Sequence, residues 1–371
     1  MKISVAFYLP SLDAGGIERV VLNLLLHLDR ARFRPVLILQ RKEGLLLQQV
    51  PADVEVRTLG GARALIAAPH LASQLRDCGA RVVYSGTNAA NIPAILASEL
   101  LRRRVAAVAS EHTPPSIFLA EAKWGVVRLA AMRAMYPRAA TIAVPLAEVG
   151  EDLRRILRRP ALSISVLPNP VFDDAIFSLK EDAPEIALPE GKVPLLVSSG
   201  RLVKAKGFDI LLEAFALLKP SPRPPTLILL GEGPERQELE SLAGSLGVAD
   251  RVRFAGNVRN PFAILSRAFA MVLSSRREGF GNVLVEAMAC GVPVVASDCP
   301  FGPRAILRGG QVGVLVPPEN PGALASGIER LLGDPGLAAE LSARGRDAAS
   351  EYSVERTVPR FESLFEELAS R

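Results

Sequence analysis

The stretch that decides the fold runs from Glu278 to Gly291 and reads EGFGNVLVEAMACG. It follows the apolar run 270–273, which predicts a buried strand. The glycines predict a tight turn, and residues 283–290 predict a short helix with Asn282 as its N-cap and Gly291 as its stop. A strand, a glycine turn and a helix N-terminus form an anion site, because unpaired backbone N–H groups point outward there.

Two glutamates flank this predicted anion site. Glu278 lies just before the turn, and Glu286 lies about one turn inside the predicted helix. A carboxylate repels a phosphate, but it accepts hydrogen bonds from hydroxyl groups. The stretch therefore predicts a ligand that has both an anionic part and a sugar part.

Strand-like and helix-like segments alternate along nearly the whole chain, which is typical of parallel α/β architecture. A length of 371 residues is sufficient for two domains. Leu167-Pro168-Asn169-Pro170 predicts a stiff hinge, because two prolines keep the chain extended. We expect an N-terminal domain at 1–170 and a C-terminal domain at 171–353. The sequence leaves open whether the last predicted helix, about 354–371, packs back on the first domain.

Several protein classes are excluded by the composition. The longest apolar runs stop far short of a membrane span, and the first ten residues are too short and too alternating for a signal peptide. The three cysteines, Cys78, Cys290 and Cys299, have no paired spacing, which argues against a disulfide scaffold and against a zinc site. We therefore expect a reduced, cytoplasmic setting.

The charge is distributed unevenly along the chain. Residues 1–170 hold 22 Lys+Arg against 13 Asp+Glu, a net of +9, whereas the remainder holds 22 against 26, a net of −4. The basic half favours an anionic partner, for which the inner face of the plasma membrane is one candidate, reached through the helix predicted at 117–136 with Trp124. Solvated arginines around a core-packed helix explain the pattern equally well. Nucleic acid is disfavoured, because no recognised binding module is present.

Three loops at predicted strand ends carry candidate site residues. Gly15-Gly16 lies at a strand-to-helix turn, and His112 lies between a strand and two prolines. Arg201 and Lys206 open a helix between two glycines, where they would clamp a diphosphate. Each feature also has a simpler explanation as a tight turn or as solvated loop residues. The G-x-G-x-x-G pattern is absent, so dinucleotide binding is unsupported.

The motifs taken together resemble glycosyltransferase family 4, a family of retaining enzymes with the GT-B fold. They occur in family order, and the second half of the chain matches more specifically than the first. The matching segments are Gly15-Gly16-Ile17-Glu18, Ser110-Glu111-His112-Thr113, Gly200-Arg201-Leu202 with Lys206-Gly207, Gly231-Glu232-Gly233-Pro234, the Glu278 and Glu286 pair, and Gly291-Val292-Pro293-Val294-Val295-Ala296-Ser297-Asp298.

The resemblance implies two Rossmann-like parallel-sheet domains facing a central cleft that binds a nucleotide-sugar donor. Arg201 and Lys206 would bind the diphosphate, and Gly15 and Gly16 would let the first domain approach it. Glu278 and His112 would act at the reacting sugar. The remaining donor-binding assignments are Glu286 for the ribose hydroxyls, Val258 and Arg259 for the base, and the backbone of Gly279, Phe280, Gly281, Asn282, Val283 and Leu284 for phosphate and sugar.

The chemistry expected of these residues agrees with this resemblance. Departure of a nucleoside diphosphate builds negative charge that Arg201, Lys206 and a helix N-terminus would stabilise. The chain has no Asp-x-Asp pattern, so we expect no metal requirement and no cofactor beyond the donor. The resemblance implies retention, with Glu278 more suited to binding sugar hydroxyls than to acting as a nucleophile. Ala305 stands where the family often has a glutamate, which leaves details of the donor site open.

The leading prediction is a metal-independent hexosyltransferase of cell-envelope polysaccharide or lipopolysaccharide synthesis. It would move a hexose or N-acetylhexosamine from a UDP-sugar to a lipid-linked or growing glycan. Two alternatives stay open: a GT-B sugar-nucleotide epimerase, and a non-catalytic protein that binds a nucleotide-sugar or a lipid phosphate. The spacing of Glu278 and Glu286 fits transfer better than epimerisation, and the intact Arg201 and Lys206 argue against a non-catalytic module.

Overall fold

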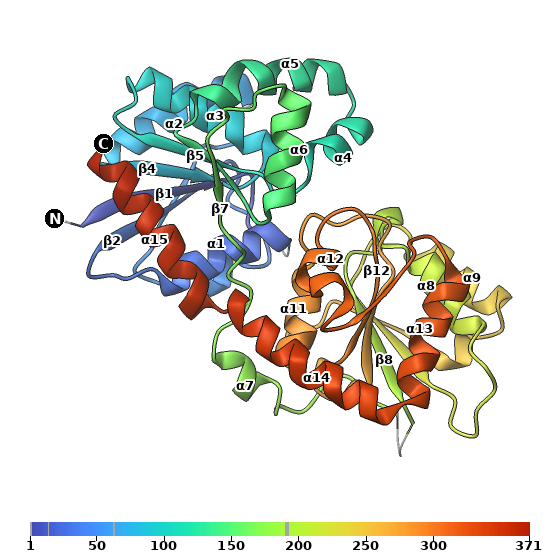
Figure 1. Cartoon of the computed structure of the whole chain (residues 1–371). Helices are drawn as coiled ribbons and strands as arrows, with labels where there is room; N and C mark the ends of the chain where they lie inside the picture. The colour runs from blue at the N-terminus through green and yellow to red at the C-terminus, as the bar shows by residue number, and fades with distance from the viewer. Residues whose placement is uncertain (1, 14, 62–63, 190–192) are drawn as a thin grey trace. The chain divides into compact units, whose positions relative to one another are not determined.

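The computed structural model describes residues 2–13, 15–61, 64–189 and 193–371, and it divides into two compact units (Figure 1). Unit 1 comprises Met1–Val171 and Tyr352–Arg371, and unit 2 comprises Phe172–Glu351. The last segment of the chain therefore belongs to the first unit. The three cysteines are free thiols.

Unit 1 contains, within its described residues, a seven-stranded parallel sheet in the order β3-β2-β1-β4-β5-β6-β7. The strands are β1 (Ile3–Leu9), β2 (Phe33–Leu39), β3 (Glu55–Thr58), β4 (Val82–Ser85), β5 (Ala106–Ser110), β6 (Thr141–Val144) and β7 (Ile164–Val166). The helices are α1 (Gly16–His27), α2 (Ala64–Asp77), α3 (Asn88–Leu100), α4 (Pro115–Glu121), α5 (Gly125–Met135), α6 (Ala147–Leu157) and α15 (Val354–Ser370). Figure 1 shows α1 and α15 on one face of this sheet and α2, α3 and α5 on the other.

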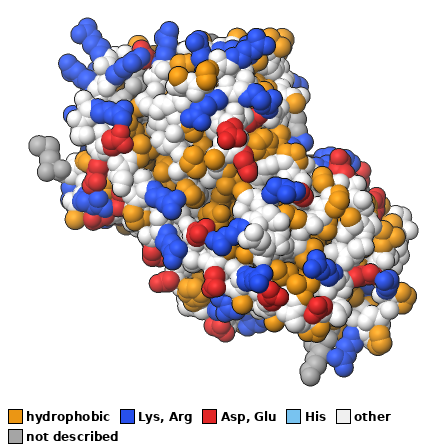
Figure 2. Space-filling view, viewed as in Figure 1, with side chains coloured by type: hydrophobic (Ala, Val, Ile, Leu, Met, Phe, Trp, Pro, Cys, Tyr) orange, Lys and Arg blue, Asp and Glu red, His pale blue; other side chains and the backbone are white. Residues whose placement is uncertain are grey.

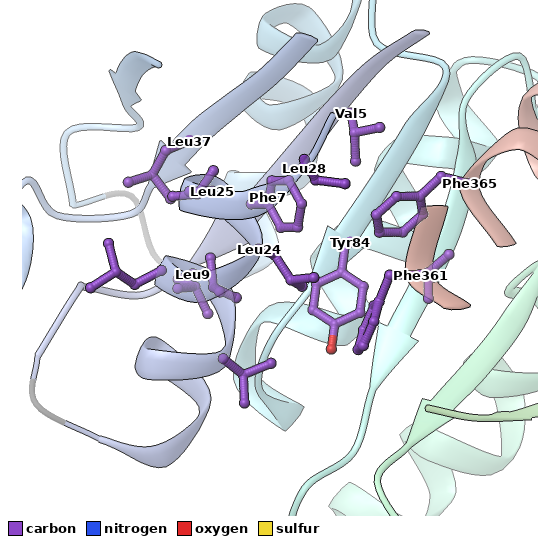
Figure 3. Close-up of a cluster of buried hydrophobic side chains, with 14 of the residues drawn as sticks. Val5, Phe7, Leu9, Leu24, Leu25, Leu28, Leu37, Tyr84, Phe361 and Phe365 are labelled. Atoms are coloured by element: carbon purple, nitrogen blue, oxygen red, sulfur yellow. The ribbon is translucent and has the colours of Figure 1, made fainter. Parts of the chain in front are cut away.

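The C-terminal helix α15 is part of the hydrophobic core of unit 1. Its buried side chains include Phe361 and Phe365, which pack with Phe7 and Tyr84 of the central strands (Figure 3). The Phe365 ring lies 6.1 Å from the Phe7 ring and 6.3 Å from the Tyr84 ring, both edge-on. Aromatic rings favour this edge-to-face arrangement because their faces are negative and their edges positive.

The single helix predicted at 117–136 is wrong, because the chain breaks between α4 and α5. Trp124 has a left-handed backbone with φ 66°, and the next residue, Gly125, begins α5. Gly125 packs so closely on α4 that a Cβ atom there would lie 2.4 Å from the carbonyl oxygen of Leu119. Glycine is the residue that permits this approach. The break leaves Trp124 78% exposed at the start of α5.

Unit 2 contains, in its described part, a six-stranded parallel sheet in the order β10-β9-β8-β11-β12-β13. The strands are β8 (Leu195–Ser199), β9 (Thr226–Leu230), β10 (Val252–Gly256), β11 (Ala270–Leu273), β12 (Val294–Ser297) and β13 (Val314–Val316). The helices are α7 (Ala175–Leu179), α8 (Phe208–Ala216), α9 (Arg236–Ser245), α10 (Phe262–Leu265), α11 (Asn282–Ala289), α12 (Pro303–Ile306), α13 (Pro321–Gly333) and α14 (Pro335–Ala349). Helices α8, α9 and α13 lie on one face and α11 and α14 on the other (Figure 1). The predicted pair of parallel α/β series is confirmed.

None of the helices in the described ranges combines the length and the apolar character that a membrane span needs.

Candidate active site

The two predicted ligand loops of unit 2 leave neighbouring strands where the strand order reverses. From β8 the chain moves outward through β9 and β10, and β11 then pairs with the other side of β8. Ligands of open parallel sheets bind at such a reversal, because the two loops diverge from the carboxyl ends of adjacent strands. The loop after β8 carries Arg201 and Lys206, and the loop after β11 carries Glu278.

Lys206 and Glu278 form an ion pair at this reversal. Lys206 Nζ lies 2.6 Å from Glu278 Oε1, and their side chains are 27% and 7% exposed. Ser275 Oγ donates a second hydrogen bond of 2.6 Å to the same oxygen. Glu278 Oε2 accepts no hydrogen bond from any residue that the structure describes. One carboxylate oxygen therefore holds the lysine while the other stays available to a ligand hydroxyl.

Arg276 fastens the loop after β8 to the loop after β11. Its guanidinium makes two hydrogen bonds of 2.7 Å with the carboxylate of Asp209, and its backbone N–H donates to the carbonyl of Ala205. Burial would raise the pKa of Asp209, but the hydrogen bonds and charge of Arg276 outweigh it and lower that pKa. The loops also touch at Gly207, where φ is 62° and a Cβ atom would lie 2.2 Å from the Ser274 carbonyl oxygen. Lys206 thus sits on a rigid turn.

The turn after Glu278 leads into α11 one residue earlier than predicted. Gly281, with φ 102°, is the N-cap, and Asn282 is the first helical residue, so the prediction of Asn282 as the cap is wrong. Glycine enters the left-handed backbone region without strain, and this moves the start of the helix. The N–H of Leu284 donates to Gly281 O over 2.9 Å. The N–H groups of Gly281 and Val283 donate to no acceptor in the described ranges, so they remain available to an anion.

The side chains of this turn have different surroundings. Phe280 and Leu284 are 4% and 0% exposed, so their side chains belong to the core and only their backbone borders the turn. Gly279 lies between Glu278 and Phe280 in the same turn, and Glu286 is half-buried one turn into α11.

Three predicted donor-binding residues of unit 2 lie outside the Lys206 and Glu278 pair. The Arg201 side chain is exposed and makes no hydrogen bond or ion pair with any described residue. Val258 and Arg259 follow the edge strand β10, and the Arg259 backbone N–H donates to Glu185 over 3.0 Å. The structure therefore brings Lys206 and Glu278 together and leaves Arg201 extended into solvent.

Three residues near the pair were missed by the motif reading. Ser275 and Arg276 follow the apolar run of β11 after one further residue, Ser274, and polar residues at that position were the available signal. Cys299 is 2% exposed, and burial, reinforced by the nearby Glu278, raises the pKa of its thiol to about 12. Cys299 is therefore a neutral thiol at neutral pH.

The predicted residues of unit 1 follow β1 and β5. Gly15 is the N-cap of α1 and Gly16 is its first residue, as expected of a strand-to-helix turn. His112 follows β5, and its Nε2 lies 2.5 Å from Ser110 Oγ. Although the residue keeps some exposed surface, the surrounding protein desolvates the ring and lowers the pKa of His112 to about 4. The imidazole is therefore neutral at physiological pH.

A buried carboxyl group lies beside His112. Glu111 is 3% exposed, and its Oε1 accepts hydrogen bonds from Tyr136 Oη, from Asn91 Nδ2 over 2.8 Å and from Asn88 Nδ2 over 3.2 Å. Burial raises the pKa of Glu111 to about 7, against the opposing effect of these hydrogen bonds. The sequence placed Glu111 next to His112 but gave no sign that three side chains from other elements enclose it.

Glu111 and His112 should have opposite effects on stability as the pH falls. The raised pKa of Glu111 gives stability that is full below pH 4.5 and is lost as the pH rises through 7. The lowered pKa of His112 gives stability that is full above pH 6.5 and is lost as the pH falls through 4. The two contributions should nearly cancel between pH 4.5 and 6.5.

We therefore expect Glu111→Gln to expose the histidine contribution. As the pH falls from 6.5 to 4.5, the free energy of unfolding of the variant should drop by about 2–3 kcal/mol relative to that of wild type, because each pKa unit corresponds to about 1.36 kcal/mol. Denaturant unfolding at several pH values measures this loss. Glu99→Gln, on α3 outside this network, should follow the wild-type profile. Parallel profiles for wild type and Glu111→Gln would contradict the assignment.

In the described part of the chain, no group of three or more His, Cys, Asp or Glu side chains is placed to hold a metal ion.

Two family models match this chain, one on each half. The model described as Glycosyltransferase Family 4 matches residues 14–174, and the model described as Glycosyl transferases group 1 matches residues 180–348. The chain belongs to glycosyltransferase family 4. The predicted family is thereby confirmed.

Two relatives of this family 4 glycosyltransferase chain are themselves named as glycosyltransferases. It is 27% identical over 345 residues, 90% of each chain, to the N-acetylgalactosamine-N,N'-diacetylbacillosaminyl-diphospho-undecaprenol 4-alpha-N-acetylgalactosaminyltransferase of Campylobacter jejuni. It is 39% identical over 154 residues to the lipopolysaccharide core biosynthesis glycosyltransferase LpsE of Rhizobium meliloti, 42% of this chain and 44% of the relative. The chain spans about half or less of the length of the first curated relatives that it matches.

The fold of the family 4 chain agrees with that of solved glycosyltransferase structures. The structure of Anabaena Alr3699/HepE in complex with UDP and glucose matches with a TM-score of 0.80 at 24% identity, covering 100% of both chains. At this identity the match shows the fold alone. The GT-B fold predicted from the resemblance, with two Rossmann-like parallel-sheet domains, is confirmed.

Proposed function

We propose that this protein is a retaining glycosyltransferase that moves a hexose or N-acetylhexosamine from a UDP-sugar to a lipid-linked or growing glycan of the cell envelope. The observation that carries the proposal is the Lys206 and Glu278 pair at the strand-order reversal of unit 2. A cation and a carboxylate with one unoccupied oxygen suit a ligand that joins a diphosphate to a sugar.

The proposed reaction breaks the bond between the anomeric carbon and the diphosphate oxygen. The acceptor hydroxyl forms the new bond on the same face, and its proton passes to the leaving diphosphate. Lys206, Arg201 and the N–H groups at the start of α11 stabilise the charge that develops on the leaving phosphate. Glu278 Oε2 accepts a hydrogen bond from a hydroxyl of the transferred sugar. His112 of unit 1 acts at the same sugar. These protein cations do the work that a metal does in other transferases, and no metal or further cofactor is part of the proposal.

The remaining donor contacts are proposed from the positions of the residues in the family motifs. Glu286 accepts from the ribose hydroxyls, and the loop at Val258 and Arg259 contacts the base. Gly15 and Gly16 add no side chain of their own to the turn after β1, where a Cβ atom on Gly15 would collide with the Glu18 carboxylate. The ligands named for Anabaena HepE, UDP and glucose, support the choice of nucleotide. The diphospho-undecaprenol in the name of the Campylobacter relative supports a lipid-linked acceptor.

A panel of nucleotide-sugars tests this proposal. A bound donor stabilises the native state, so UDP-sugars should raise the melting temperature while GDP- and ADP-sugars do not. The stabilising donor is then incubated with a diphospho-polyprenyl glycan, and sugar should move to the lipid with its anomeric configuration retained. Free epimerised sugar without acceptor would identify an epimerase instead. Donor binding with no turnover would identify a binding protein.

We further propose that unit 1 binds an anionic membrane surface through the start of α5. Trp124, Val126 and Val127 are 78%, 83% and 63% exposed there, and exposed Lys123 and Arg128 adjoin them. Figure 2 shows Lys and Arg side chains gathered along the upper part of unit 1, with hydrophobic side chains among them over α5. Tryptophan and basic residues together favour the interface of an anionic bilayer. The protein would then be cytoplasmic and peripheral on the inner face of the plasma membrane.

Trp124→Ala should weaken this membrane binding about tenfold, because one large interfacial side chain is worth about 1.4 kcal/mol or more. Flotation with phosphatidylglycerol vesicles measures the effect. Leu45→Ala is the matched control, because Leu45 is 68% exposed elsewhere in unit 1. Equal flotation of wild type with anionic and with neutral vesicles would contradict the proposal, as would unchanged flotation of Trp124→Ala.

A further inference from the structure

A chain of hydrogen bonds leads from the aromatic core of unit 1 to His112. The Tyr84 ring is buried among Phe7, Phe361 and Phe365, and its hydroxyl lies at the edge of this cluster (Figure 3). Tyr84 Oη donates to Ser110 Oγ over 2.8 Å. Ser110 Oγ in turn lies 2.5 Å from His112 Nε2. The chain thus joins a core residue on β4 to the histidine after β5.

The order of donors along this chain follows from its first member. Burial raises the pKa of the Tyr84 phenol, so the phenol keeps its proton. Within the described ranges, the only acceptor that meets this proton is Ser110 Oγ. A serine hydroxyl that accepts one hydrogen bond still has its own proton to donate. The nearest acceptor for that proton is His112 Nε2, and Nε2 must then be unprotonated.

The neighbouring polar groups do not compete for the serine proton. Asn91 Oδ1 accepts from Ser85 Oγ over 2.7 Å and from the Ser110 backbone N–H over 3.3 Å. Glu111 Oε1 accepts from Tyr136, Asn91 and Asn88. Both acceptors are thus already engaged, so the Ser110 hydroxyl donates its proton to His112 Nε2.

We propose that Tyr84 and Ser110 are positioning residues that hold His112 as the Nδ1–H tautomer. The neutral ring then presents a hydrogen-bond donor to an oxygen of the transferred sugar, and it does not present a base. Nδ1 makes no hydrogen bond with any residue that the structure describes, so its proton is available. This inference rests on the proposed function for the identity of the ligand, whereas the tautomer is a property of the free protein.

The ¹⁵N NMR spectrum of the imidazole groups tests the tautomer directly. The sequence has three histidines, His27, His70 and His112, so His112→Asn assigns the relevant signals by their loss. At neutral pH we expect the His112 Nε2 signal at the shift of an unprotonated ring nitrogen and the Nδ1 signal at that of a protonated one. The reverse pattern in wild type would overturn the proposal. This measurement requires no substrate.

Tyr84→Phe tests the relay, because it keeps the packed ring and removes the proton that fixes the serine. We expect the variant to gain the Nε2–H tautomer and kcat for transfer to fall about tenfold, the usual scale of one hydrogen bond. The donor KM should change less than twofold. Tyr8→Phe is the matched control, since Tyr8 is buried on the adjacent strand β1 and takes no part in the Ser110 chain.

Conservative and disruptive changes at Ser110 complete the test. Ser110→Thr keeps the hydroxyl, so it should retain the Nδ1–H tautomer and the wild-type kcat. Ser110→Ala should lose the preference for that tautomer, and its kcat should fall. Unchanged NMR shifts and unchanged kcat in Tyr84→Phe, with its melting temperature intact, would overturn the relay. If wild type transfers no sugar, the proposed function fails, while the NMR result still decides the tautomer.

Discussion

Replacing Lys206 with alanine should lower kcat/KM for sugar transfer by about 10²–10³-fold, or about 3–4 kcal/mol of transition-state stabilisation, the scale measured for one electrostatic donor in an active site. The lysine is only 27% exposed and lies on a turn that Arg276 fastens to the next loop. Its charge is therefore held in place before the leaving phosphate develops its own, and no reorganisation is needed during the reaction.

Lys204→Ala is the matched control for this substitution. Lys204 lies in the same turn, is 68% exposed, and pairs with Asp209 over 3.5 Å. An exposed ion pair of this kind contributes little, so transfer by Lys204→Ala should stay within about twofold of wild type. Steady-state kinetics with saturating acceptor compare the two variants.

Lys206→Ala also leaves the Glu278 carboxylate buried with Ser275 as its remaining partner. An uncompensated buried charge destabilises the fold, so the variant should lose about 1–3 kcal/mol of unfolding free energy. Adding Glu278→Gln removes the buried charge and should restore stability without restoring transfer. Transfer at the wild-type rate by a folded Lys206→Ala would exclude the proposed role.

Local patterns predicted the two sheets and the strand-end loops, because alternation and glycine turns are properties of short segments. They did not predict that Lys206 and Glu278 would pair, since the two side chains were assigned to different parts of the ligand. The residues are 72 positions apart, and their contact depends on which strands become neighbours. The break at Trp124 was hidden for a related reason: the helical pattern continues across it, and the close approach of Gly125 to α4 is tertiary.

The contacts of the site in unit 1 could not be predicted from local sequence patterns either. Position alone selected His112, because of the three histidines it is the one in a loop at the carboxyl end of a predicted strand. Its environment comes from Tyr84 on another strand and from Glu111, whose hydrogen bond to Tyr136 spans 25 residues. The enclosure of a carboxyl group by distant polar side chains leaves no periodic signal in a sequence.

Phe365→Ala should destabilise unit 1 by about 3–5 kcal/mol, the usual cost of deleting a buried phenylalanine ring. Phe365 is fully buried, and its ring contacts those of Phe7, Phe33 and Tyr84 at centroid distances of 6.1, 6.4 and 6.3 Å. Alanine would leave a cavity between α15 and the strands that the rigid sheet cannot close. The C-terminal helix would then lose its main attachment.

Hydrogen exchange followed by mass spectrometry measures this change for each unit separately. Peptides from β1 and β4 should lose protection in Phe365→Ala, whereas peptides from β8 and β11 should not, which makes unit 2 an internal control. Ser363→Ala, at an exposed position of the same helix, should stay within about 0.5 kcal/mol of wild type. Equal loss of protection in both units would mean that α15 does not act through the core of unit 1. Loss confined to unit 1 would show that the last 20 residues complete the domain that begins the chain.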